Sequence, residues 1–321
     1  MAKVYINELT MGQNVETLVM IKRKQLSKIP NGPGYYLSVI CMDKTGEIEG
    51  RIWETPQEIN SKVQDKDIFS VKGVVTEYKG KPIIKIDDLN KVDDSLCDLA
   101  DFLPCTPKSR RDMFEELVQV MSSIRNPYLR KLLKEFLSDP DWLKDFTCAP
   151  AEKRSHQPYI GGLLEHSMNV VNICLKFTEI YKFLDYDLLV TGAILHDVGK
   201  VNEFDYRRTI DYSTAGRLLG HIILGVQLVE EKIKTIPDFP EELRIALLHL
   251  IVSHHGEYER QSPKKPKFFE AMLLHFADRL DTEAFQFEYL RNSQEDSKQN
   301  LVFLEDFDDT FSSLKRERGI L

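Results

Sequence analysis

The stretch AILHDVGK, Ala193–Lys200, is the part of the sequence around which the rest is organised. His196 and Asp197 stand side by side at the end of an apolar run with helical character, and Gly199 and Lys200 close it. A neutral imidazole beside an anionic carboxylate suits a divalent metal of borderline hardness. The His196-Asp197 pair by itself is weak evidence for a metal site, because most adjacent His and Asp residues arise by chance. The other histidines therefore decide whether it marks a metal site.

The histidines are concentrated in the second half of the chain, and none of the eight precedes residue 156. Further candidate ligands follow one another in separate apolar helical segments: His166, His221, His254, His255 and Asp278. Side chains from several helices can converge on one point inside a bundle. The pattern therefore predicts a metal site within a helical bundle.

Length and composition predict two domains of a soluble protein. A chain of 321 residues is too long for one ordinary core, and 42% hydrophobic with 29% charged residues is a globular composition. The start, MAKVYINEL, lacks an apolar signal region, and no apolar run reaches the roughly 18 residues of a spanning helix. Five cysteines without a CxxC pair disfavour a disulfide framework or a thiolate zinc site. We expect a cytoplasmic protein without a membrane partner.

Charge is distributed unevenly along the chain. The net charge of −8 argues against a strong non-specific nucleic-acid binder. Residues 1–92 nevertheless hold 14 Lys and Arg against 12 Asp and Glu, whereas the remainder holds 29 against 39. This asymmetry predicts that the first part binds a polyanion and the second part binds metal.

Residues 1–92 have the pattern of strands. The β-rich segments are Val15–Arg23, Tyr35–Asp43, Glu47–Trp53, Ile68–Tyr78 and Pro82–Ile86. A short helix is expected at Pro56–Val63, between the third and fourth strands. Five strands with a helix at that place follow the order of an OB-fold barrel. The segment resembles the nucleic-acid-binding OB-folds.

Aromatic and basic residues of this barrel are candidates for binding a nucleic acid. Tyr36 or its neighbour Tyr35, with Trp53 and Tyr78, would stack on bases. The cations expected to meet phosphates are Lys22, Arg23, Lys24, Lys79 and Lys81. In the alternative interpretation the aromatics fill the barrel and the cations are solvated surface.

The remainder is predicted to be a linker, a helical domain and a tail. Residues 93–110 lose periodicity and contain two prolines, which is typical of a linker. Helical spacing marks the segments 111–124, 127–137, 163–182, 187–196, 215–234, 240–254 and 267–289. We therefore predict an α+β multidomain protein, with an OB-fold barrel over 1–92, an all-α bundle over 111–290 and a polar tail over 291–321.

The order H…HD…H…HH…D resembles that of the HD-domain metal-dependent phosphohydrolases over about residues 150–290, and HDVGK matches the signature of that superfamily. The resemblance implies that His166, His196, Asp197 and Asp278 are core metal ligands. It implies that His221 and His254 are the additional histidines of members with two metals, with Asp197 as the bridge. His255 matches the second histidine of the doublet in some members.

A pair of divalent ions about 3.5–4 Å apart activates water at neutral pH and neutralises charge that develops on phosphorus. The sequence has no recognisable Ser or Cys nucleophile motif, so we expect direct attack by water, with Asp197 as a catalytic residue.

Two cations lie close to the ligand segments in sequence. Lys200 is expected to bind a phosphoryl oxygen or assist the leaving group, and the alternative is a solvent-facing residue at a helix end. Arg217, four residues before His221, is expected on the same helix face and in contact with a phosphate. Among the remaining histidines, His156 is expected on the surface, with contact to the substrate as the alternative. His249 is expected in the core or on the surface, and His275 is a candidate to support the ligands.

The combined order of an OB-like and an HD domain resembles the YhaM-type 3′-to-5′ exoribonucleases over nearly the full chain, as does the segment HQPYIGGLLEHSMNV, residues 156–170. The resemblance implies a nuclease supported by two Mn²⁺ ions, or by other transition metals, that releases mononucleotides from single-stranded RNA, with single-stranded DNA as a second substrate. A homo-oligomer is expected.

Two alternatives stay open from the sequence. The first is an HD hydrolase of small nucleotides whose front domain serves assembly or regulation. The second is a non-catalytic OB-fold nucleic-acid-binding protein with a structural metal. Four ligands would close a structural site, whereas seven candidates are present, which disfavours the second alternative.

Overall fold

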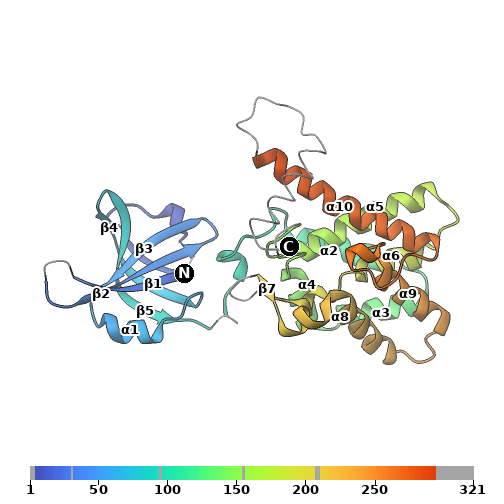
Figure 1. Cartoon of the computed structure of the whole chain (residues 1–321), viewed down its shortest axis with the longest axis horizontal. Helices are drawn as coiled ribbons and strands as arrows, with labels where there is room; N and C mark the ends of the chain where they lie inside the picture. The colour runs from blue at the N-terminus through green and yellow to red at the C-terminus, as the bar shows by residue number, and fades with distance from the viewer. Residues whose placement is uncertain (1–3, 30–31, 94–95, 154–155, 207–209, 294–321) are drawn as a thin grey trace. The chain divides into compact units, whose positions relative to one another are not determined.

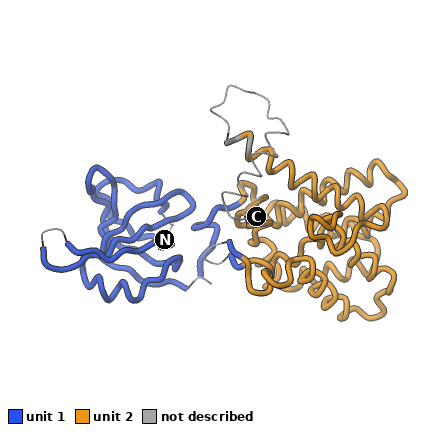
Figure 2. Tube along the Cα trace, in the orientation of Figure 1, with its two compact units in different colours: residues 1–105, 205–211 blue, residues 106–204, 212–321 orange. Residues whose placement is uncertain are grey.

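The computed structural model describes residues 4–29, 32–93, 96–153, 156–206 and 210–293 (Figure 1). The chain divides into two compact units, residues 1–105 with 205–211 and residues 106–204 with 212–321 (Figure 2). The boundary between Cys105 and Thr106 falls inside the predicted linker. Residues 294–321 of the predicted tail lie outside the described residues.

Unit 1 contains a closed five-stranded barrel. Its strands are β1 (Asn14–Lys28), β2 (Tyr35–Asp43), β3 (Gly46–Ile52), β4 (Ile68–Tyr78) and β5 (Lys81–Lys91). They close in the order β1-β2-β3-β5-β4, in which β3 and β5 are parallel and the other pairs are antiparallel. Helix α1 (Pro56–Lys62) lies between β3 and β4 in the chain. The OB-like barrel predicted from the strand order is confirmed, with β1 and β5 longer than expected.

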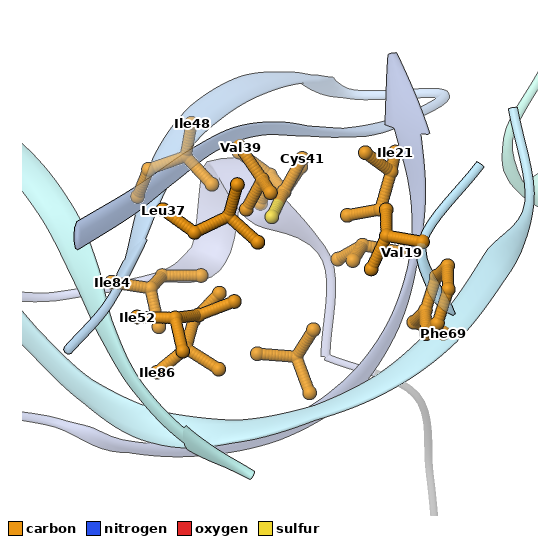
Figure 3. Close-up of a cluster of buried hydrophobic side chains, with 13 residues drawn as sticks. Val19, Ile21, Leu37, Val39, Cys41, Ile48, Ile52, Phe69, Ile84 and Ile86 are labelled. Carbon is orange, nitrogen blue, oxygen red and sulfur yellow. The ribbon is translucent and has the colours of Figure 1, made fainter. Parts of the chain in front are cut away.

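Alternation along the strands builds the barrel core. In β2 every second side chain is buried, and Leu37 pairs across the ladder with Ile52 of β3. The inward side chains include Val19, Ile21, Val39, Ile84 and Ile86 (Figure 3). Gly50 also belongs to this interior, because a Cβ there would come within 2.5 Å of Ile86 Cδ1. Burial of these branched apolar groups is the main force that closes the barrel.

Two short 3₁₀ helices complete the described part of unit 1, η1 (Ile6–Glu8) and η3 (Leu99–Asp101). Asp43 Oδ2 accepts a hydrogen bond from Ile6 N at 2.8 Å, which ties η1 to the barrel. Asp101 accepts from Lys44 N at 2.9 Å and from the Tyr5 hydroxyl at 2.7 Å. The first half of the predicted linker therefore packs on the barrel.

Unit 2 is a helical bundle. Its helices are α2 (Arg110–Ser123), α3 (Pro127–Leu137), α4 (Pro140–Cys148), α5 (Gly162–Ile180), α6 (Tyr186–Leu195), α7 (Lys200–Glu203), α8 (Thr214–Lys234), α9 (Glu241–Ser253) and α10 (Phe269–Ser293). Further elements are the 3₁₀ turn η4 (Tyr258–Arg260) and the two-residue strands β6 (Phe204–Asp205) and β7 (Asp211–Tyr212). The predicted class is confirmed, although α4, α7 and the β6–β7 pair were not expected. None of the described helices is both long and apolar enough to cross a membrane.

Helix α6 is the centre of the bundle, and it carries the His-Asp pair. Asp185 caps its first turn by accepting from Leu188 N at 3.0 Å. All side chains from Leu188 to Leu195 are buried, and α6 contacts α5, α9 and α10. A helix that is apolar on all sides is stable only when other helices surround it. Its end, at His196, therefore lies inside the protein.

Candidate metal centre

The seven predicted ligands converge within unit 2, and they form two sets that share Asp197. His166 of α5 and His196 at the end of α6 place their Nε2 atoms 3.2 Å apart. Asp197 Oδ2 lies 3.4 Å from each of these two nitrogens. Asp278 Oδ1 of α10 lies 3.2 Å from His166 Nε2 and 3.9 Å from His196 Nε2. The first set thus combines two imidazoles and two carboxylates.

The second set faces the other oxygen of the same carboxylate. Asp197 Oδ1 lies 3.5 Å from His221 Nε2 and 3.4 Å from His254 Nε2. The His255 ring lies 5.0 Å from the His221 ring and 4.4 Å from the His254 ring, and these three histidines group their ligand atoms within 4.8 Å. One carboxylate with an oxygen directed at each set has the arrangement of a bridge between two ions.

These distances fit metal ions better than direct hydrogen bonds. Ligand bonds of about 2.0–2.2 Å place neighbouring ligand atoms of one ion roughly 3 Å apart, as the Nε2 atoms of His166 and His196 are. Asp197 Oδ1, His221 Nε2 and His254 Nε2 are buried, and they have no hydrogen-bond partner within the described residues. Buried polar atoms without partners are costly, so a cation between them would remove a penalty. Nitrogen and oxygen donors together suit a transition metal.

The local structure fixes which nitrogen of each ring is available. His196 and His254 follow the last residue of α6 and of α9, and their Nδ1 atoms lie 2.8 and 2.7 Å from the carbonyl oxygens of Ala193 and Ile251. A carbonyl only accepts, so Nδ1 carries the hydrogen and Nε2 keeps a lone pair. The two helix ends therefore present unprotonated nitrogens to the centre.

Two carboxylates that the sequence did not single out hold the other two rings. Asp281 Oδ2 lies 2.7 Å from His166 Nδ1, and Glu203 Oε1 lies 3.2 Å from His221 Nδ1. Asp281 also accepts from Gln157 Nε2 at 3.0 Å and from Asn169 Nδ2 at 2.8 Å. The spacing of Asp281, one turn after Asp278, was a signal that could have identified it. Such outer carboxylates orient a ligand and raise its basicity.

Charge interactions set the protonation of the site. Burial alone would raise the pKa of Asp197, but Lys200, His196 and His166 hold it well below its usual range. Burial would lower the pKa of His166, whereas Asp197, Asp278 and Asp281 raise it well above the ordinary value. Burial lowers the pKa of His254 and lowers that of His255 to about 2. His166 is thus the ligand for which a proton competes most strongly.

Lys200 begins α7 and points inward. Its Nζ lies 2.6 Å from Asp197 Oδ2, and only 5% of its side chain is exposed. Burial would lower its pKa, but Asp197 and Glu203 raise it, so Lys200 is a cation. The alternative interpretation of a solvent-facing residue at a helix end is therefore wrong.

Arg217 and His221 do not lie on one helix face, contrary to the prediction. Gly220 has φ 72° and ψ 161°, so α8 is kinked between the two residues. Residues four apart share a face only on a continuous helix. Arg217 is exposed, and its role at a phosphate stays a prediction without that support.

His156 was expected on the surface, with contact to the substrate as the alternative, and the surface expectation is wrong. The residue is 8% exposed, and its ring lies edge-on to the His166 ring, with the centroids 5.2 Å apart. Burial and the charges of Lys200 and His166 lower its pKa to about 3. His275 supports the site indirectly, because its Nδ1 lies 2.9 Å from the carbonyl oxygen of His254. His249 is outside both sets, with its Nε2 accepting from Lys267 N at 3.0 Å.

The barrel has an aromatic cluster on its outer face. Tyr36 and Trp53 stack with ring centroids 5.0 Å apart, and Trp53 is 41% exposed. Arg51, which the sequence analysis did not name, lies 3.5 Å above the Tyr78 ring and donates to Glu49 at 2.8 Å. None of these aromatics belongs to the core of Figure 3, so the alternative in which they fill the barrel is wrong.

The predicted cations of the barrel differ in their surroundings. A bulge in β1 between Ile21 and Arg23 leaves both Lys22 and Arg23 exposed. Lys22 forms an exposed ion pair with Glu47 at 2.5 Å. Lys24 instead donates to the carbonyl oxygens of Asn60 and Val63 at the end of α1, so its role is structural. Lys79 lies over the Tyr78 ring at 5.5 Å.

Comparison with known proteins matches residues 163–283 to the family model of the HD domain. These residues therefore form an HD domain, and with the His and Asp groups the match supports a metal-dependent phosphohydrolase.

Three solved structures are similar to parts of the chain. The second OB-fold domain of replication protein A from Methanococcus maripaludis is 22% identical, with 29% of this chain and 96% of that chain covered and a TM-score of 0.25. The HD domain of the L. monocytogenes phosphodiesterase PgpH is 15% identical, with 61% and 86% covered and a TM-score of 0.28. Asparaginyl-tRNA synthetase from Pyrococcus horikoshii is 11% identical, with 76% and 63% covered and a TM-score of 0.24. TM-scores of this size support no conclusion about function.

Proposed function

We propose that this protein is a metal-dependent 3′-to-5′ exoribonuclease that hydrolyses single-stranded RNA to mononucleotides, and single-stranded DNA as a second substrate. The observation that carries the proposal is the pair of ligand sets that share Asp197, on a chain that also holds an OB-like barrel. A shared carboxylate suits two divalent ions, and phosphodiester hydrolysis is a typical reaction of such pairs.

The proposed roles of the residues follow from their contacts. His166, His196 and Asp278 would hold one ion, His221, His254 and His255 the other, and Asp197 both. Two divalent ions, here proposed to be Mn²⁺, supply Lewis acidity and lower the pKa of water. Lys200, which is buried and cationic beside Asp197, would bind a non-bridging phosphate oxygen.

The barrel supports a single-stranded polymer as the substrate. The exposed face of Trp53, with Tyr36 behind it, offers a platform on which a base can stack. The exposed side chains of Lys22 and Arg23 would meet phosphates. The site itself lies among helices, and four of its proposed ligands, His166, His196, Asp197 and His254, are buried, which suits an unpaired strand better than an A-form duplex.

The test compares labelled RNA single strands that share one sequence and differ at their ends, incubated with Mn²⁺. With a 5′ label we expect a ladder that shortens from the 3′ end, and with a 3′ label immediate release of the labelled mononucleotide. A circular strand and a strand with a 3′-phosphate should resist, and a hairpin should stop degradation a few nucleotides before the duplex. The matched control for Asp197→Asn is Asp238→Asn, an exposed residue at φ 55° that asparagine tolerates.

Two results would contradict this proposal in different ways. Rapid cleavage of the circle would show entry within the strand and exclude an exonuclease. Hydrolysis of free nucleotides without any action on oligomers would favour a small-nucleotide hydrolase. Either result leaves the metal centre as described, whereas full activity of Asp197→Asn would contradict the centre itself.

A further inference from the structure

His156 is a buried imidazole beside the metal centre whose nitrogens have no protein partner in the described part of the chain. Both Nδ1 and Nε2 are shielded from solvent and form no hydrogen bond within the described residues. The four histidine rings that face Asp197 differ from the His156 ring in this respect, because each of them has its Nδ1 beside a carbonyl or carboxylate oxygen. A buried polar group without a partner costs free energy, so the ring is suited to a partner that the described residues do not supply.

Residues 156–161, which include His156, pack against the start of α5. Gln157 has φ 37°, and its carbonyl accepts from Ala151 N at 3.3 Å and from Tyr159 N at 2.9 Å. A Cβ at Gly162 would come within 2.1 Å of the same oxygen, so only glycine permits this approach. The Gln157 side chain donates to Asp281, the carboxylate that holds His166. The residue next to His156 therefore also holds the carboxylate that orients His166.

The surroundings of the ring indicate what it binds. It lies against His166, and Lys200 and Asp197 act on it electrostatically. Lys200 is the cation for which a phosphate oxygen is the expected partner. His156 is not in either group of residues whose ligand atoms lie within 4.8 Å of one another. A ring that lies outside the ligand sets, packs against His166 and is influenced by the charge of Lys200 suits contact with the substrate.

We propose that His156 is a further catalytic residue, which donates a ring N–H to a non-bridging oxygen of the phosphoryl group that is cleaved. The proposal deepens the proposed function and rests on it. In the proposed complex, one phosphoryl oxygen of the substrate lies between His156 and Lys200. The hydrogen bond would be made to a charged acceptor in a site that excludes water, where such bonds are strong.

The test uses the full chain loaded with Mn²⁺ and two substitutions of His156. His156→Phe keeps an aromatic edge against His166 but has no N–H, and His156→Gln keeps a donor. Calorimetric titration with inorganic phosphate measures binding, metal analysis measures ion content, and kcat/KM is measured on a single-stranded RNA. We expect His156→Phe to retain wild-type Mn²⁺ content and to lose about 10- to 100-fold in phosphate affinity and in kcat/KM. His156→Gln should recover part of both losses.

Other outcomes overturn the inference and are distinguishable from failure of the proposed function. If His156→Phe binds phosphate as tightly as the wild type, the ring only packs against His166. If His156→Phe loses an ion, His156 acts on the metal and not on the substrate. Failure of the exonuclease proposal would instead appear in the wild-type protein, as the absence of a 3′-to-5′ ladder.

Discussion

A single carboxylate, that of Asp197, determines the arrangement of the candidate centre. Its Oδ2 faces His166 and His196, and its Oδ1 faces the rings from α8 and α9. Asparagine has the same shape but replaces one oxygen by an NH₂ group that cannot bind a cation. Asp197 is therefore the position at which the loss of one charge affects both sets.

The orientation of His166 depends on Asp281. Asp281→Asn would replace one of the two carboxylate oxygens by an NH₂ group. The three donors Gln157 Nε2, Asn169 Nδ2 and His166 Nδ1 would then no longer all find an acceptor. We expect Mn²⁺ affinity to fall by about 10- to 100-fold, as for other outer carboxylates of metal ligands. Titration with Mn²⁺ measures the loss, with Asp238→Asn as the matched control. Unchanged affinity would show that His166 does not need this partner.

Metal binding should depend on pH through His166. Its pKa is raised well above the usual value, so below that pKa the proton occupies the nitrogen that a metal needs. Binding therefore releases a proton, and Mn²⁺ affinity should fall as the pH falls, about tenfold per pH unit for each proton released. Calorimetry in buffers of different ionisation enthalpy counts the released protons. An affinity that stays constant between about pH 6 and pH 8 would exclude His166 as a ligand.

At the residue scale, the sequence predicted the residues that carry unusual chemistry and missed those that act by position. Chance rarely produces this combination of residue types in this order along the chain: His166, His196, Asp197 and Asp278. Asp281 and Glu203 are common residues on helices, and only the folded chain shows which ring each one faces. His156 follows polar residues and precedes a proline, which is typical of a surface turn. Its burial results from packing of that turn against α5.

Among the elements, α8 is the one whose shape matters most for the second ligand set. The kink at Gly220 frees the backbone N–H of His221, which donates to Glu203 Oε1 at 3.0 Å. The same carboxylate lies beside the His221 ring. Glu203 thus caps the restarted helix and orients its first side chain. Sequence periodicity shows a continuous helix here, because a single glycine does not interrupt the apolar pattern.

Gly220→Ala should affect one ligand set and not the other. Space is available, since a Cβ would be 4.0 Å from Glu203 Oε1, but φ 72° with ψ 161° is a conformation that only glycine adopts readily. We expect the protein to lose its second Mn²⁺ at concentrations that still fill the first set. Counting bound Mn²⁺ against free Mn²⁺ tests this expectation.

Gly80→Ala is the matched control, because Gly80 also has a positive φ, 77°, and a Cβ there meets nothing within 4 Å. It places a Cβ on another glycine of positive φ, far from the ligands in sequence, and should keep both ions. Equal loss of both ions in Gly220→Ala would mean that the kink supports the bundle in general.

Helix α4 shows why the sequence analysis did not predict some of the helices. Asp139-Pro140 has the appearance of a break between helices. In the structure Asp139 caps α4 by accepting from Trp142 N at 3.1 Å, and Pro140 occupies the first turn. Asp before Pro is a good helix start, because the missing N–H of proline is not needed there. Only the residues after Pro140 could show whether Asp139-Pro140 begins a helix or separates two helices. The segment Pro140–Cys148 is too short to show a clear helical spacing of apolar residues.

At the scale of the whole molecule, the order of the two units was predictable and the connection between them was not. Residues 93–110 have the composition of a linker. Thr106 Oγ1 nevertheless donates to the buried Glu165 at 2.6 Å, and Lys108 lies 3.1 Å from the same carboxylate. Tyr159 also donates to Glu165 at 2.9 Å. The contacts of Thr106 and Lys108 with Glu165 join residues far apart in the sequence, so local patterns give no sign of them.

Removal of the stacking platform should separate strand binding from chemistry. Trp53→Ala, made in the Asp197→Asn background to prevent degradation, should weaken binding of a long single-stranded RNA by about 5- to 150-fold. Trp53→Ala alone should hydrolyse a small phosphodiester at the wild-type rate. Fluorescence anisotropy of labelled RNA measures the affinity. Tyr289→Ala, which removes an aromatic residue of similar exposure from α10, is the control. Equal affinities would place the strand elsewhere on the molecule.

The positions of the ligands along the chain also matter while the protein is being made. The barrel is complete once Lys91 has left the ribosome, and domains near the N-terminus fold first during synthesis. The last ligand, Asp278, lies in α10, which leaves the ribosome only after the barrel and after helices α2 to α9. A ribosome that stops between these points leaves a polypeptide with a finished barrel and an unfinished metal centre. On the proposed function, such a fragment would bind a transcript without cutting it, and would shield the RNA that the full-length enzyme degrades.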